Sequence, residues 1–173
     1  MKSEILIWIF PIIFMIHEFE EIIFIRWWLG KNREPILKKY PNLGKRVLRK
    51  FELISTETFS LIVAEEFLIV SFVVILSALT TNFNLYFGLI VAYFIHLLTH
   101  LIQAIAIRKY TPGIITTFLT GIFCVFVFFR LVNSGLLSFN LAFFYSVVLT
   151  LVVFMNLRLM HHLAKKIKIL NID

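Results

Sequence analysis

Residues 5–28 read ILIWIFPIIFMIHEFEEIIFIRWW, and this stretch decides what kind of fold the chain adopts. Both flanks are almost wholly apolar. The run is long enough for a helix to cross the hydrocarbon core of a bilayer, which takes about 20 residues. At its centre lie His17, Glu18, Glu20 and Glu21. The stretch therefore predicts a membrane-spanning helix that carries ionisable side chains near its middle.

The composition of the whole chain agrees with a membrane protein. Of its 173 residues, 60% are hydrophobic and 20 are phenylalanine, whereas soluble domains are nearer half apolar. This length leaves room for one helical domain over residues 1–173. The single cysteine, Cys124, excludes an intrachain disulfide and a cysteine-based zinc site.

Four further apolar runs are about as long as the first. Only helices and closed barrels satisfy their backbone hydrogen bonds in lipid, and continuous runs of this length favour helices. We expect an all-α, polytopic membrane bundle of five transmembrane helices. The expected spans are residues 4–28, 56–80, 84–107, 112–134 and 138–159.

The basic residues predict how this bundle is oriented. They gather in a loop expected at 29–55, in the turn after the third span and beyond the fifth span. Five spans with an outside N-terminus place all of these regions on one side. Since loops rich in lysine and arginine stay in the cytoplasm, we expect an N-out, C-in, multi-pass protein of the cell (inner) membrane. Orientation and contact with anionic lipid then account for the net charge of +7, so no nucleic-acid partner is expected.

The expected spans contain more acidic than basic side chains at mid-depth. A charge near mid-membrane costs about 2.5–3.5 kcal/mol on insertion scales, and unperturbed histidines are neutral near pH 7. Counted from the inner boundary, the ionisable residues of the first three spans fall in one layer, roughly 10–18 Å deep. The excess negative charge requires protons or a bound metal cation at one shared site. The glutamates concerned are Glu18, Glu20, Glu21, Glu65 and Glu66.

Helical spacing assigns roles to these residues. His17, Glu20 and Glu21 share one helix face, and the HxxxH spacing of the third span presents two imidazoles to one ion. Glu65 and Glu66 are adjacent, so only one can face the bundle; Thr58, two turns earlier, favours Glu65, although the choice stays open. The predicted metal ligands are His17, Glu21, Glu65, His96 and His100. Glu20 and Glu66 are the predicted general bases, and Glu18, Tyr93, Gln103 and Asn156 are expected to support the ligands.

The ligand types indicate the metal and the reaction class. Imidazole and carboxylate suit zinc, iron or manganese, and we expect one or two divalent ions, with zinc as the first choice. The expected function is a metal-dependent hydrolase that acts on a lipid or lipid-linked substrate from the cytoplasmic leaflet. The alternatives are an ion- or proton-coupled transporter or metal carrier, a di-iron lipid oxidase, and a purely structural role. Five helices are few for a transporter, so a carrier would need a homo-oligomer.

Three motifs together resemble a known family. HEFEE (17–21), AEEF (64–67) and HLLTH (96–100) resemble the HXXEE family of small bacterial and archaeal membrane proteins, over roughly residues 5–110. The function of that family is not established, so the resemblance implies a membrane-embedded metal site and says little about the substrate. A weaker likeness links EEIIFIR (20–26) to intramembrane glutamate proteases of prenylated proteins. This chain exceeds their EExxxR spacing by one residue, and an intramembrane protease stays a further alternative.

Overall fold

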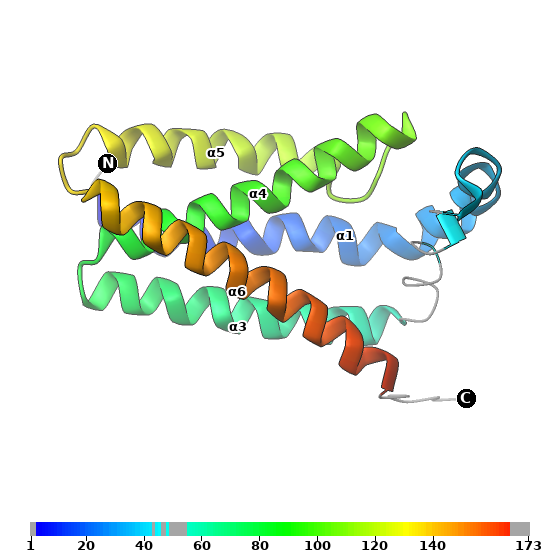
Figure 1. The fold of residues 1–173 in the computed structure, drawn as a ribbon, viewed down its shortest axis with the longest axis horizontal. Helices are drawn as coiled ribbons and strands as arrows, with labels where there is room; N and C mark the ends of the chain where they lie inside the picture. Colours follow the sequence, from blue (N-terminus) through cyan, green and yellow to red (C-terminus); the bar gives the residue numbers. More distant parts are fainter. Residues whose placement is uncertain (1–2, 43, 46–47, 49–54, 167–173) are drawn as a thin grey trace.

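Long helices account for most of the residues that the computed structural model describes, which are 3–42, 44–45, 48 and 55–166. Within these ranges there is no strand, which confirms the all-α prediction (Figure 1). The five long helices are α1 (Ser3–Lys39), α3 (Thr56–Leu79), α4 (Phe83–Ile107), α5 (Ile114–Val132) and α6 (Phe139–Lys166).

Four of these helices are long and apolar enough to cross a bilayer. They are α3, α4, α5 and the Phe139–Met160 part of α6, and they coincide within a few residues with the second to fifth predicted spans. Many large apolar side chains are exposed on their outer surface, and such a surface is suited to contact with lipid. The chain therefore has the helices of a multi-pass membrane protein. Helix α1 is longer than any of them but carries the three glutamates of HEFEE near its middle.

Helix α1 is also longer than its sequence predicts. The first span was expected to end at residue 28 and to be followed by a loop, yet the helix continues to Lys39. Trp28, Leu29 and Ile36 are buried in an apolar cluster with Phe59 at the start of α3, and this burial offsets the weak helix propensity of Gly30. The remainder of the expected basic loop, with Arg46, Arg49 and Lys50, lies largely outside the described residues.

The connections explain how successive helices reverse direction. Ser55 caps the first turn of α3 by accepting from Thr58 N, and Asn82 caps α4 by accepting from Leu85 N. Helix α4 ends at Arg108 in the left-handed conformation, and α5 begins after Gly113, which has φ of +86°. Because each helix reverses the previous one, α1 begins and α6 ends at opposite ends of the bundle (Figure 1).

Helices α1 and α4 meet through large aromatic side chains. The ring of Phe10 packs edge-on against Tyr86 and Tyr93, with centroid separations of 6.2 and 5.2 Å. The Tyr86 hydroxyl donates to the Leu6 carbonyl oxygen at 2.7 Å. These side chains fill one part of the seam between the two helices, and the ionisable residues of both helices occupy the next part.

Helix α4 approaches α6 closely at a glycine. A Cβ on Gly88 would lie 2.7 Å from the carbonyl carbon of Tyr145, so no other residue fits there without a shift of backbone. Helix α4 packs extensively on α6, whereas α3 and α6 touch at few points. This arrangement leaves α6 as one side of a cavity that α1, α3 and α4 complete.

Candidate metal centre

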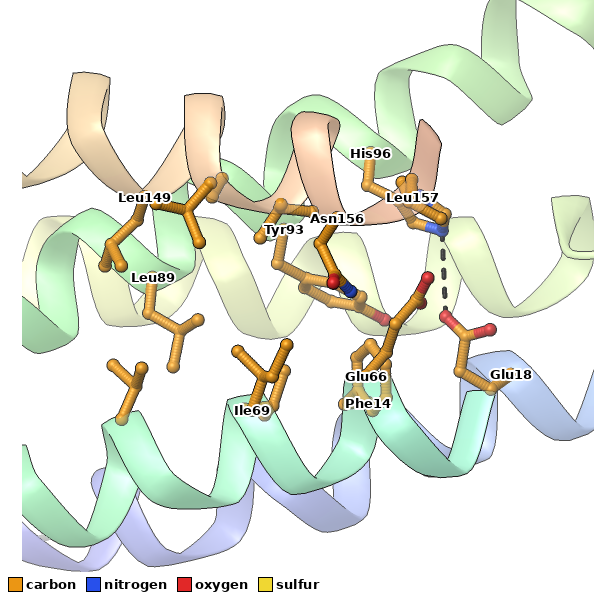
Figure 2. A pocket seen from close by; sticks show the side chains of 15 residues that line it. Phe14, Glu18, Glu66, Ile69, Leu89, Tyr93, His96, Leu149, Asn156 and Leu157 are labelled. Atoms are coloured by element: carbon orange, nitrogen blue, oxygen red, sulfur yellow. Dashed lines mark ion pairs between the residues drawn. The ribbon is translucent and has the colours of Figure 1, made fainter. Parts of the chain in front are cut away.

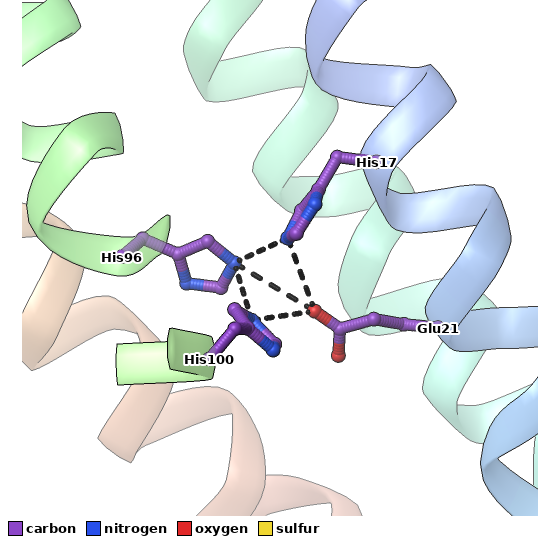
Figure 3. A group of neighbouring side chains, drawn as sticks. All are labelled: His17, Glu21, His96 and His100. Carbon is purple, nitrogen blue, oxygen red and sulfur yellow. Dashed lines mark hydrogen bonds and ion pairs between the residues drawn. The ribbon is translucent and has the colours of Figure 1, made fainter. Parts of the chain in front are cut away.

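Four side chains of α1 and α4 converge on one point in the seam between these helices (Figure 3). His96 Nε2 lies 3.2 Å from His17 Nε2 and 3.1 Å from His100 Nε2. Glu21 Oε1 lies 2.9 Å from His100 Nε2, 3.4 Å from His17 Nε2 and 3.7 Å from His96 Nε2. All four atoms lie within 4.8 Å of one another.

The spacing of these four atoms fits a metal ion. Zinc binds histidine nitrogen at about 2.0–2.1 Å and carboxylate oxygen at about 2.0–2.2 Å, so ligands that surround one ion tetrahedrally lie roughly 3.3–3.5 Å apart. The five separations given above, 2.9 to 3.7 Å, are close to this spacing. Three imidazole nitrogens that face one another need a cation or a proton between them, because their lone pairs repel when each points inward. The donor set and its spacing therefore match a bound divalent ion.

Helical geometry brings the four ligand atoms together. His17 and Glu21 are one turn apart on α1, and His96 and His100 are one turn apart on α4, so each helix presents two groups from a single face. His17 is fully buried and His100 is 5% exposed. Tyr93, one turn before His96, packs edge-on against His17 and parallel to His96. The packing restricts the orientation of the imidazoles before any metal binds.

The first turn of α5 forms a hydrogen bond with the Nδ1 atom of His17, the ring nitrogen that is not directed at the other three side chains. The Thr116 hydroxyl lies 2.6 Å from Glu20 Oε2 and 3.0 Å from His17 Nδ1. An ionised carboxylate only accepts hydrogen bonds, so the hydroxyl donates to Glu20 and accepts from His17 Nδ1–H. The proton on Nδ1 leaves the lone pair of His17 Nε2 directed at the other three ligands. Such a chain behind a histidine orients the ring and raises its basicity as a ligand.

Glu20 is fully engaged in this support. Its Oε1 accepts from the Tyr110 hydroxyl at 2.8 Å, and its Oε2 accepts from Thr116 N at 2.8 Å at the positive end of α5. Burial and this contact with the carboxylate raise the pKa of Tyr110, so the phenol remains a donor. Both oxygens of Glu20 are thus directed at α5 and the preceding turn, and its role as a general base stays a prediction.

The other predicted residues divide into two groups. Glu18, 3% exposed, lies with Oε1 3.7 Å from His96 Nε2, and it lines a cavity together with Glu66, Tyr93 and Asn156 (Figure 2). Glu65 does not join the four ligand atoms; its Oε2 accepts from Asn156 Nδ2 at 2.8 Å. Adjacent residues point about 100° apart on a helix, so placing Glu66 toward the cavity turns Glu65 toward α6. Gln103 is exposed, which gives no support to its predicted role beside the ligands.

Thr116 and Gly113 belong to the site but were missed by sequence reasoning. Thr116 lies four residues past the expected start of the fourth span, and the sequence TPGIITT shows only a turn followed by a helix. One signal could have linked Thr116 to Glu20. Helix N-termini attract carboxylates, so a glutamate at mid-membrane could have been paired with the start of a neighbouring helix. Gly113 lies directly behind the rings of His17 and His100.

Replacement of Thr116 by valine tests the chain of hydrogen bonds. Valine has nearly the same shape but leaves His17 Nδ1 and Glu20 without the bridging hydroxyl. We expect metal affinity to fall by about 10–100-fold, the usual cost of losing a partner behind a ligand, as measured by competition with a chromophoric chelator. Thr116→Ser keeps the hydroxyl and is the control. Equal affinities for the valine variant and the wild-type protein would contradict the assignment.

Comparisons with known proteins identify a family. Neither a search of curated proteins nor a search of solved structures gives a match. The model of one family, described as "Protein of unknown function with HXXEE motif", matches residues 8–129, which include both ligand-bearing helices. Its defining motif corresponds to His17, Glu20 and Glu21; His17 and Glu21 belong to the cluster of four side chains, and Glu20 shares the Thr116 hydroxyl with His17. The chain belongs to the HXXEE family.

Proposed function

We propose that this protein is a membrane-embedded, metal-dependent hydrolase that acts on a lipid or lipid-linked substrate. One observation carries the proposal: the four ligand atoms lie beside a cavity into which two further carboxylates, Glu18 and Glu66, are directed. Glu18 Oε1 and Glu66 Oε1 are both buried and have no hydrogen-bond partner. A buried carboxylate oxygen without a partner is costly, and such groups persist where function needs them.

The residues divide the work of hydrolysis between them. His17, Glu21, His96 and His100 would hold the ion, with zinc as the first choice and iron or manganese as alternatives. When bound, such an ion polarises a carbonyl or phosphoryl oxygen and lowers the pKa of water toward about 7. Glu66, with Glu18 as its neighbour in the cavity, would accept the proton from water during attack. Glu20, Thr116 and Tyr110 would keep His17 in the ligating tautomer.

The proposal also includes a fifth span and an orientation. Helix α1 would cross the membrane with α3 to α6, its glutamates compensated by the metal. The C-terminal ends of α1 and α4 and the following turn carry Lys31, Arg33, Arg108 and Lys109, so this end of the bundle would be cytoplasmic. His100 lies eight residues before Arg108, about 12 Å along the helix. Substrate would then reach the site from the cytoplasmic leaflet of the cell membrane.

The test combines metal analysis with a search for turnover. Elemental analysis of the purified protein should find close to one or two tightly held divalent ions per chain. Incubation with a total lipid extract, followed by mass spectrometry, should reveal products that the Glu66→Gln variant forms at least about 100-fold more slowly. Glu65→Gln is the matched control, because its amide oxygen can still accept from Asn156. Loosely held, readily exchanged ion together with proton-coupled flux in liposomes would instead establish a carrier and overturn the proposal.

A further inference from the structure

We infer that the cavity between α1, α3, α4 and α6 binds a single hydrocarbon chain of the substrate, with the reacting polar group placed beside Glu18, Glu66 and His96. This inference rests on the proposed function and specifies its substrate class. The cavity is partly open, and its walls come from all four of these helices.

The cavity changes from polar to apolar along its length. Its polar side chains are at one end, where Glu18, Glu66, His96 and Asn156 gather. Leu89 and Leu149, seven residues from His96 and Asn156 on α4 and α6, line the other end (Figure 2). Val73, which also lines the cavity, is seven residues from Glu66 on α3. Seven helical residues span about 10 Å. Three helices therefore change character in the same direction over the same distance, as a site for an amphiphile with a polar head and a long apolar tail requires.

The direction of this change matches that of a lipid in one leaflet. The polar end lies toward the end of the bundle that carries Arg108 and Lys109, and the apolar end lies toward the opposite side. Helix axes and lipid chains both run roughly along the bilayer normal. A lipid from the leaflet on the basic side could thus enter with its chain already parallel to the cavity.

An entry route lies along α6. Val152 lines the cavity and is nevertheless 44% exposed on the outside of the bundle. Leu149, one turn earlier on the same helix, is 8% exposed and lies deeper. Helices α3 and α6 both line the cavity and touch at few points, so the opening that this inference requires lies between them. An opening toward lipid admits a hydrocarbon chain without exposing it to water.

The polar end supplies the recognition of the head. Glu18 Oε1 lies 3.7 Å from His96 Nε2, so a group bound there would touch both the cavity carboxylates and the metal ligands. The free oxygens of Glu18 and Glu66 favour a head that donates hydrogen bonds or brings water, such as an ester or amide with a neighbouring hydroxyl. A fully apolar molecule would leave both oxygens unsatisfied.

Photolabelling in nanodiscs tests the inference without requiring turnover. The full-length protein is irradiated with a palmitic acid that carries a diazirine at mid-chain, and labelled residues are located by mass spectrometry. We expect saturable labelling at Val73, Leu89 and Leu149. Excess unlabelled palmitic acid or geranylgeraniol is added in separate arms; competition by either one supports a hydrocarbon-chain site and tells an acyl source from an isoprenoid one. Labelling that no competitor reduces, or that falls only on lipid-facing side chains, overturns the inference.

A matched pair of variants on α6 places the site. Val152→Trp fills the opening at a position that is partly exposed, so the fold should tolerate it, and saturable labelling at Leu89 should fall about tenfold or more. Leu151→Trp adds the same bulk to the adjacent, 55% exposed residue outside the cavity and should leave labelling unchanged. Equal labelling in both variants overturns the inference.

Metal content separates this inference from the proposed function. Val152→Trp changes no ligand, so its metal content should equal that of the wild-type protein. Protein that retains metal but shows no saturable labelling overturns the hydrocarbon-chain site alone. Protein that is labelled in the cavity but retains no metal supports the chain site and overturns the proposed metal-dependent function.

Discussion

Replacing Glu21 with glutamine is expected to weaken metal binding by more than about 100-fold, beyond the loss caused by removing a supporting partner. Glutamine keeps the shape of the side chain and an oxygen that can accept from His100 Nε2, 2.9 Å away, but it removes the only negative charge among the four ligand atoms. The metal-free protein should be as stable as wild type or more so, because a buried carboxylate is costly when no cation compensates it.

These opposite effects distinguish a metal ligand from a structural carboxylate. Elemental analysis after dialysis against chelator measures the first effect, and thermal unfolding of the chelated protein in detergent measures the second. Glu34→Gln is the control, since Glu34 lies on α1 with an 82% exposed side chain that forms an exposed ion pair with Arg33. Wild-type metal content in Glu21→Gln, or marked destabilisation of the metal-free variant, would refute the assignment.

Replacing Gly113 with alanine is expected to disrupt the centre from behind. The added Cβ would lie 2.9 Å from His100 Nδ1 and 3.2 Å from His17 Cε1, so both rings must shift. The φ of +86° adds a backbone cost of about 1–2 kcal/mol for any residue with a Cβ. We expect a clearly lower unfolding temperature and a metal affinity about tenfold lower or worse.

Gly135→Ala isolates the contribution of the rings. Gly135 also has a positive φ, +70°, but a Cβ there would meet no atom within 4 Å. The Gly135→Ala variant should therefore be less stable, because of the backbone strain, without any loss of metal affinity. If the two variants bind metal equally well, the contact of Gly113 with the imidazoles does not matter for the site.

Helix positions followed closely from the sequence where lipid dictates them. The apolar runs predicted α3 to α6 because a backbone in hydrocarbon has few alternatives to a helix. The prediction was wrong where that constraint ends, at the C-terminal part of α1. Gly30 and Asn32 indicated a turn, but Asn32 donates to the Trp28 carbonyl oxygen within the helix, and Trp28 is buried against its neighbours. Tertiary packing decided this end, and local sequence does not contain that information.

The candidate site was predictable to the extent that it depends on helical spacing. His17 with Glu21 and His96 with His100 are each one turn apart, and the structure brings these four together. The carboxylates were harder to assign, because Glu18, Glu20 and Glu21 differ only in angle around one helix. Which of these side chains faces α5 and which faces the cavity depends on how the helices pack. In the structure Glu20 contacts α5 and the turn before it, whereas Glu18 and Glu66, rather than Glu65, line the cavity.

Helix α6 contributes none of the four ligand atoms, yet it forms a long wall of the cavity. It also begins at Phe139, beyond the region that the family shares with this chain, residues 8–129. The parts that would hold the ion and the part that would select its lipid are thus separate along the polypeptide. We therefore expect relatives to differ in substrate preference through changes in the sequence of the final helix, while the residues that would hold the ion stay the same.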